Sequence, residues 1–233
     1  MPPSYREIAP DPALRPWVEC CWIASGEAEA RDVLPDGCID FLFDAADGTA
    51  RLIGAMTRPE PVPAGACDLT AVRFRPGGAH AVLGLPMHEL TDAAVPLADL
   101  GRALRELAAR IGDARDAAAR LSVLEAWLLA RRPARHDAIG CALRTLEQAR
   151  GRCRVDDLAA AAGTSRQWFA RSVRERTGLA PKLLARILRL RAAAATRRPG
   201  EPLAALALRC GFADQAHLAR DARELFGAPP SRW

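Results

Sequence analysis

The sequence contains no uninterrupted apolar run long enough to cross a bilayer, and its first residues lack the basic and apolar segments of a secretory signal. Its seven cysteines are scattered, with no C-x-x-C pair and no H-x-x-x-H pattern beside them. We therefore expect a cytoplasmic protein with reduced thiols, without a membrane span, a metal or a cofactor. No cysteine has an activating neighbour, and Cys38 lies beside acidic residues that raise a thiol pKa, so an enzyme is not expected.

Lysine is also nearly absent, because Lys182 is the single one and arginine carries almost all of the positive charge. The net charge of +5 is unevenly distributed along the 233 residues. Residues 139–233 hold 18 Lys or Arg against 8 Asp or Glu, a formal charge of +10, whereas residues 1–138 carry −5. A basic half of this kind favours a polyanion partner, with nucleic acid first, although an Arg-rich solvated surface gives the same count.

The pattern predicts an α+β chain of two domains, residues 1–132 and 138–233, joined at the polar segment RRPARHD. Residues 15–76 alternate short β-like runs with turn formers and predict a small β-rich unit, which helices follow over residues 78–131. In that helical stretch, Leu97, Leu100, Leu104 and Leu107 recur on one face of an expected helix.

The second domain contains no convincing strand and predicts seven helices at most. Within it one unit occurs twice: Ala159 precedes Gly163 by four residues, as Ala207 precedes Gly211. A small Ala lets two helices cross closely, and a Gly adopts the left-handed turn between them. A capping residue and an amphipathic helix follow each glycine, which is the helix-turn-helix pattern, with the second turn one residue longer.

A helix over residues 181–198 is expected to connect the two units. Its length of about 27 Å is comparable with the ~34 Å between successive major-groove faces on one side of B-DNA.

Residues from about 139 to 233 resemble the DNA-binding domain of AraC-type (AraC/XylS) transcription regulators. The resemblance rests on VDDLAAAAGTSRQWFARSV, RTGLAPKLLARILRLRAAAA and ALRCGFADQAHLAR followed by FGAPPSRW. The segments VLPDGCIDFLF, RFRPGGAHAVLGLP and ELTDAAVPLADL are similar to a sensing-type domain that precedes such readers. The resemblance implies an all-α double helix-turn-helix domain behind a β-rich sensing or dimerisation domain.

The residues expected to contact DNA lie on the two second helices of the repeated units. Gln167 and Arg171 share a helix face and suit adenine and guanine, and the resemblance places Gln167, Ala170 and Arg171 toward base edges. The full set of expected DNA-binding residues is Arg166, Gln167, Ala170, Arg171, Arg174, Gln215, Ala216, Ala219 and Arg220. Five further arginines are weaker candidates for phosphate contacts: Arg152, Arg154, Arg186, Arg189 and Arg191. Because aromatic residues usual in the family are replaced by Leu218 and Ala222, the second unit is expected to be held less rigidly.

In the amino-terminal part, an ordinary apolar core is the favoured interpretation of Trp22, Cys38 and Phe41, and the wall of an effector cavity is the alternative. Arg73 and Arg75 lie two apart on a strand-like run and are candidates for binding an anionic effector, with salt bridges to nearby acids as the alternative.

These observations predict a sequence-specific DNA-binding transcription regulator, modulated by a small-molecule effector or by self-association as a homodimer. Its expected partners are double-stranded promoter DNA and the transcription machinery. The alternative is a ligand-binding protein whose degenerate helix-turn-helix domain serves protein interaction.

Overall fold

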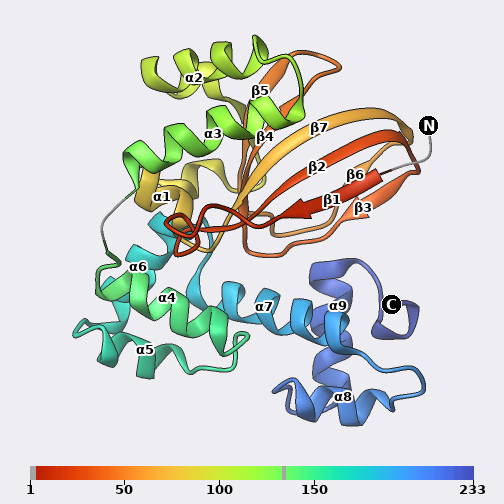
Figure 1. The fold of residues 1–233 in the computed structure, drawn as a ribbon. Coiled ribbons are helices and arrows are strands. Elements are labelled where there is room, and N and C mark those ends of the chain that lie inside the picture. The colour runs from red at the N-terminus through yellow and green to blue at the C-terminus, as the bar shows by residue number, and fades with distance from the viewer. Residues whose placement is uncertain (1–3, 133–134) are drawn as a thin grey trace.

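The computed structural model describes residues 4–132 and 135–233 and has the expected α+β fold (Figure 1). Strands and helices make up the amino-terminal part, and the described residues of the carboxyl-terminal part form helices and no strand. Pro133 and Ala134, in the predicted joint, lie outside the described residues, so the boundaries at residues 132 and 138 stay a prediction.

An antiparallel sheet of six strands, ordered β1-β2-β7-β4-β5-β8, forms the frame of the amino-terminal part. A separate two-stranded ribbon, β3 with β6, lies beside it. Strands β2, β4, β5 and β7 match the β-like runs expected from the sequence, whereas the short strands β1, β3, β6 and β8 were not expected. The strands are β1 (Ser4–Ile8), β2 (Val18–Ala28), β3 (Arg31–Val33), β4 (Ile39–Asp44), β5 (Thr49–Ile53), β6 (Glu60–Val62), β7 (Gly65–Phe74) and β8 (Ala94–Pro96).

Side chains alternate strictly along β4 and thereby give the sheet two different faces. Ile39, Phe41 and Phe43 are buried in the main core, where Phe41 meets Phe74 edge-on at 5.1 Å between ring centroids. The intervening Asp40 and Leu42 point to the opposite face and line a cavity there.

Helices cover the core face of the sheet, as Figure 1 shows for α2 and α3. The helical elements of this part are α1 (Gly78–Leu83), η1 (Met87–Leu90), η2 (Leu97–Leu100), α2 (Arg102–Gly112) and α3 (Ala117–Arg131). The expectation of one continuous helix through Leu97 and Leu107 is wrong, because Gly101 has a φ of 119° and separates η2 from α2. Strand β8 also interrupts the segment that was expected to be helical.

The carboxyl-terminal part repeats a two-helix unit at either end of one long helix. Its helices are α4 (Ala138–Gln148), α5 (Val155–Ala161), α6 (Arg166–Thr177), α7 (Pro181–Thr196), α8 (Leu203–Arg209), α9 (Gln215–Phe226) and η3 (Pro230–Arg232). Helix α7 ends two residues earlier than expected, because Arg197 is extended ahead of the Arg198-Pro199 pair.

The two sharp turns share one hydrogen-bonding pattern. Gly163 and Gly211 have φ values of 66° and 81°, the left-handed conformation that the sequence predicted. The amide of Thr164 donates to the carbonyl of Ala159 at 3.0 Å, and the amide of Phe212 donates to that of Ala207 at 2.9 Å. Both alanines are buried, so the small residue does permit the close helix crossing.

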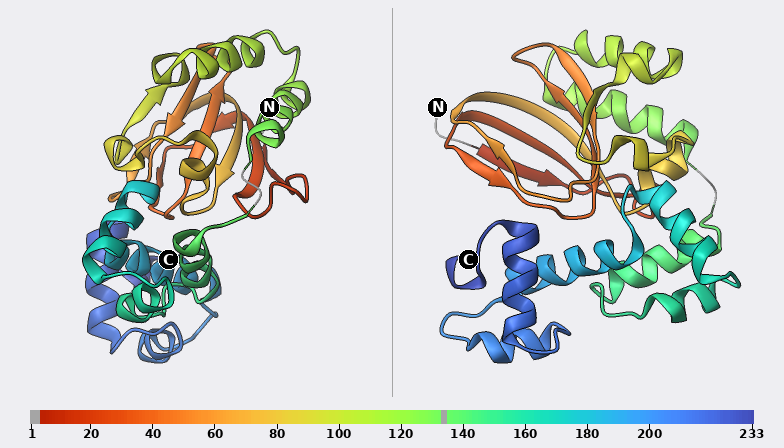
Figure 2. Two further views of the ribbon diagram at one scale, coloured as in Figure 1. Left: turned by 90° about the vertical axis from the view of Figure 1, so that its left-hand side faces the viewer. Right: turned by 180° about the vertical axis from the view of Figure 1, so that it is seen from behind.

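The two parts pack directly against each other along α7 and α6 (Figure 2). Gly37, in the turn before β4, lies against the side chain of Leu184 on α7. At the end of α6, the Thr91 hydroxyl donates to the carbonyl of Gly178 at 2.8 Å. A single cluster of buried apolar side chains runs through both parts. Among the described residues, no helix is long and apolar enough to cross a membrane.

Candidate functional site

Helix α6 presents a polar face that the other described residues leave largely exposed, with Arg166 at its start paired to Asp156 of α5 at 3.2 Å. Ser165 caps it by accepting the amide of Trp168 at 3.2 Å, which fixes where the helix begins. The expected DNA-binding side chains on it are exposed, apart from the half-buried Ala170: Arg166, Gln167, Arg171 and Arg174. The opposite face buries Phe169 and Val173 in the core, as the sequence predicted.

Trp168, in the first turn of α6, was missed by sequence reasoning. Its side chain is 49% exposed, which is unusual for so large an apolar residue. Its position beside Gln167 was the available signal, because the buried face was already filled by Phe169 and Val173. An exposed indole here adds apolar contact area to the open face of α6.

Helix α9 presents the corresponding face of the second unit. Asp214 caps it by accepting the amide of His217 at 2.7 Å. Gln215, Ala216 and Arg220 are exposed and Ala219 is half-buried, so this face carries two hydrogen-bonding side chains and two small apolar ones.

A cluster of charged side chains holds α9 on α7. Arg186 of α7 donates to Asp221 at 2.9 Å and to Glu224 at 2.6 Å, and Asp221 is buried. Leu218 and Ala222 are fully buried as well. Ion pairs thus supplement the smaller apolar contacts that hold the second unit, and its lower rigidity stays a prediction.

Two of the arginines considered for phosphate contacts are committed within the protein. The Arg186 guanidinium binds the two carboxylates on α9, and Arg191 binds Glu19 of β2. A third, Arg189, is half-buried with its guanidinium 5.4 Å from the ring centroid of Phe212.

On the face of the sheet opposite the main core, a cavity of about 470 Å³ lies between the strands and the β3–β6 ribbon. Trp22, Cys38 and Arg73 line it, so the structure brings together three of the residues expected around an effector. The apolar part of the lining comes from Tyr5, Trp22, Val33, Leu42, Ile53, Met56, Val62 and Leu69.

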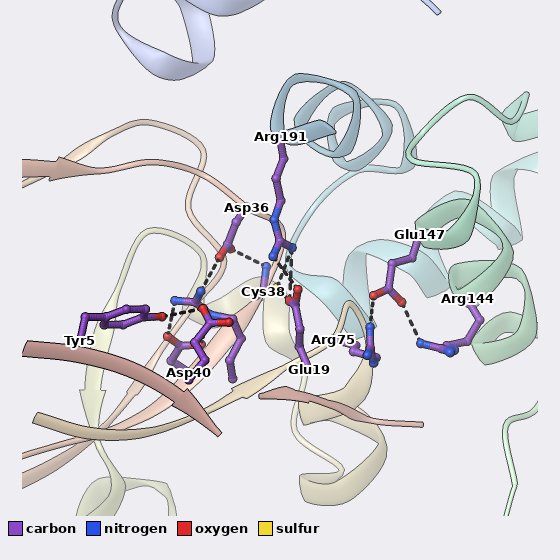
Figure 3. A network of polar contacts seen from close by, with 11 residues as sticks. Tyr5, Glu19, Asp36, Cys38, Asp40, Arg75, Arg144, Glu147 and Arg191 are labelled. Carbon is purple, nitrogen blue, oxygen red and sulfur yellow. Dashed lines mark hydrogen bonds and ion pairs between the residues drawn. The ribbon is translucent and has the colours of Figure 1, made fainter. Parts of the chain in front are cut away.

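The two other candidates lie elsewhere, and these expectations are corrected. Phe41 is on the core face, because side chains alternate along β4 and Cys38 and Phe41 are an odd number of residues apart. Arg75 follows the end of β7 and turns away, so that it pairs with Glu147 of α4 instead of sharing a side with Arg73 (Figure 3).

Arg73 is neutralised by carboxylates at the wall of the cavity. Its guanidinium donates two hydrogen bonds to Asp40, at 3.2 and 3.1 Å, and lies 3.6 Å from Asp36. Trp22 donates its indole N–H to Asp40 at 3.2 Å. Burial outweighs these contacts and raises the pKa of Asp40 to about 6. The salt bridges that the sequence offered as the alternative for Arg73 are thus present.

From this cavity, a short polar chain leads to α7. Cys38 donates its thiol to Glu19 at 3.1 Å, and Glu19 accepts hydrogen bonds from Arg191 at 2.5 and 3.2 Å (Figure 3). Burial opposes ionisation of Glu19, yet the hydrogen bonds and charge of Arg191 lower its pKa. Burial and the neighbouring carboxylates raise the pKa of Cys38 well above its usual value, which confirms the expected direction.

No group of three or more His, Cys, Asp or Glu side chains in the described residues could hold a metal ion. The described residues offer two candidate sites: the open faces of α6 and α9, and the cavity beside the β3–β6 ribbon.

Several solved structures are similar to the chain at a low level. A 1.65 Å structure of ToxT from Vibrio cholerae is 12% identical, with a TM-score of 0.44 over 99% of this chain and 96% of that chain. A structure of ToxT with a bound unsaturated fatty acid is 13% identical, with a TM-score of 0.39 over 88% of this chain and 92% of that chain. TM-scores below 0.5 are too low for conclusions about this chain.

Sequence families match both parts of the chain. Residues 6–96 match a domain of unknown function, DUF6597, and residues 158–233 match a helix-turn-helix domain. No curated protein is significantly similar to the chain. The second match begins within α5 and covers the rest of the first unit, α7, the whole second unit and the open faces of α6 and α9. Residues 158–233 thus form a helix-turn-helix domain with the open faces of α6 and α9 inside it.

Proposed function

We propose that the chain binds a promoter sequence through both helix-turn-helix units and that a small molecule in the cavity of the amino-terminal part modulates this binding. One observation supports the reading function above the others. Two capped helices, α6 and α9, present exposed polar faces at either end of α7. With 16 residues, α7 is about 24 Å long, so the two helices suit successive major-groove faces of one DNA segment.

Base reading is assigned to the centre of each open face. Arg171 can bind guanine with two hydrogen bonds and Gln167 can bind adenine, while Arg166 and Arg174 flank them for phosphates. On α9, Arg220 and Gln215 are the hydrogen-bonding groups, and Ala216 and Ala219 offer contact to thymine methyl groups. The first unit is therefore expected to discriminate sequence more strongly than the second.

The modulating step is assigned to the turn that holds Asp36, Gly37 and Cys38. Asp36 and Cys38 line the cavity, and Gly37 between them packs on Leu184 of α7. A molecule that moves this turn would displace α7, on which both units are mounted. Coupling between two sites requires two states of the protein that each ligand binds differently, and two discrete positions of this turn would provide them.

The remaining assignments follow from action at a promoter. We place the protein in the cytoplasm, as a regulator without catalytic activity, in contact with the transcription machinery and able to form a homodimer. The domains are assigned to residues 1–132 and 138–233.

Selection of random DNA duplexes by the purified full chain, at two salt concentrations, tests the reading function. We expect an enriched motif of two blocks about one helical turn apart, and an affinity that falls with salt by about 0.9 log units per log unit for each phosphate neutralised. Arg171→Ala should lose preference in one block, whereas Arg102→Ala, on the exposed surface of α2, should retain both. Retention of DNA without an enriched motif would contradict sequence reading. Absence of retention at either salt would favour the protein-interaction alternative.

A further inference from the structure

The cavity beside the β3–β6 ribbon carries more negative than positive charge. Five carboxylates line it, from Asp32, Asp36, Asp40, Glu60 and Asp92, against two guanidinium groups, from Arg31 and Arg73. Arg73 is already bound on two sides by Asp40 and Asp36. An anionic ligand would therefore meet a neutralised arginine among uncompensated carboxylates, which disfavours the anionic effector for which Arg73 and Arg75 were candidates.

The walls of the same cavity are apolar and aromatic. Tyr5 and Trp22 stand side by side, with ring centroids 5.9 Å apart, and both line the cavity. The guanidinium of Arg73 already lies 6.0 Å from the ring of Trp22, so this wall accommodates a cation over an aromatic face. Ile53, Met56 and Val62 extend the apolar lining toward the ribbon.

We propose that the effector of this protein is an organic cation, an amine or quaternary ammonium with an apolar body, bound between the Tyr5–Trp22 wall and the carboxylates of the cavity. Rings attract cations through their negative faces, and carboxylates compensate the charge of a cation as it leaves water. The volume of about 470 Å³ suits a molecule of small-drug size. The proposal rests on the proposed function only in calling the cation an effector, since cation binding in the cavity requires no DNA.

Isothermal titration calorimetry of the full chain with three probes of similar shape tests the charge preference. The probes are benzyltrimethylammonium, its uncharged isostere neopentylbenzene and the anion phenylacetate, at one ionic strength. We expect benzyltrimethylammonium to bind at least about tenfold more tightly than phenylacetate, a difference of ~1.4 kcal/mol. Equal binding of the three probes, tighter binding of the anion, or absence of cation binding at millimolar concentration would overturn the proposal.

Charge-removing variants locate the binding to the cavity. Asp40→Asn leaves Arg73 with Asp36 alone, so the preference should shift toward phenylacetate, an outcome that a merely structural role does not produce. If Asp40→Asn does not fold, the double variant Asp32→Asn with Glu60→Gln takes its place, because it changes exposed residues of the ribbon. This double variant should weaken cation binding several-fold. Asp99→Asn, an exposed acid outside the cavity, is the matched control and should bind as the parent does. Unchanged preference in both cavity variants would overturn the assignment.

The calorimetry tests the ligand class and the duplex selection tests the regulator, so a negative result in one does not decide the other. Cation binding by a chain that selects no DNA motif would leave the ligand class standing and refute the proposed regulator. A DNA motif without cation binding would refute the ligand class and leave the regulator standing.

Discussion

Replacement of Gly37 by alanine tests whether the amino-terminal part lies against α7 in solution. Gly37 has a φ of +80°, and a β-carbon there would lie 2.8 Å from Cδ1 of Leu184, which is fully buried. Gly48→Ala is the matched control, because its φ is +69° and nothing lies within 4 Å of the added atom. The left-handed conformation alone costs alanine about 1–2 kcal/mol, which is the expected loss for Gly48→Ala. Overpacking against Leu184 adds ~1–3 kcal/mol, so Gly37→Ala should lose about 2–5 kcal/mol in total.

Urea denaturation, followed by tryptophan fluorescence, gives the free energy of unfolding of both variants. A double-mutant cycle with Leu184→Val then identifies the contact. In a Leu184→Val background the clashing carbon is gone, so the cost of Gly37→Ala should fall to that of Gly48→Ala. If Gly37→Ala costs no more than Gly48→Ala in the parent chain, then Gly37 does not pack on α7 and the proposed route from the cavity to the DNA readers is refuted.

Four further results are expected. Arg171→Ala should weaken specific DNA binding by about 1–3 kcal/mol in a titration of the selected site, with unchanged circular dichroism; full retention of sequence preference would contradict its role. Glu19→Gln should lower stability to urea by about 1 kcal/mol, because it removes one charge of a half-buried ion pair with Arg191. The same variant should reduce the effect of benzyltrimethylammonium on DNA affinity, and an unchanged effect would rule out this ion pair as the link. Finally, affinity for that cation should fall as the pH drops below about 6, because Asp40, which faces Arg73, Asp36 and Trp22, then takes up a proton; Asp40→Asn should flatten the calorimetric pH profile.

The carboxyl-terminal helices could be predicted nearly to the residue, because their signals are local. Ser165 caps α6 and Asp214 caps α9 through their own side chains. Gly163 and Gly211 form the turns between the paired helices, and Pro181 begins α7. The conformations of these residues depend little on distant parts of the chain.

The amino-terminal part was predicted less completely, because its features depend on residues distant in sequence. Strands of three residues such as β3, β6 and β8 are too short to show a periodic pattern, and they form only by pairing with neighbouring strands. The positions of Phe41 and Arg75 depended on where each strand ends, and the pairing of Arg191 with Glu19 spans 172 residues. The net charge of the cavity likewise appears only after folding brings its lining residues together.

Helix α7 contacts both the DNA-reading units and the amino-terminal part, so its shape connects the two. It sets the separation and the relative rotation of α6 and α9, and its other side bears Gly37 and Glu19 of the amino-terminal part. A small bend in this helix would change the phase between the two recognition helices and leave each of them intact. The affinity for an operator whose two blocks are one base pair closer or farther apart would then differ between the states of the protein. The preferred spacing of the blocks, as well as their base sequence, would thus depend on the effector.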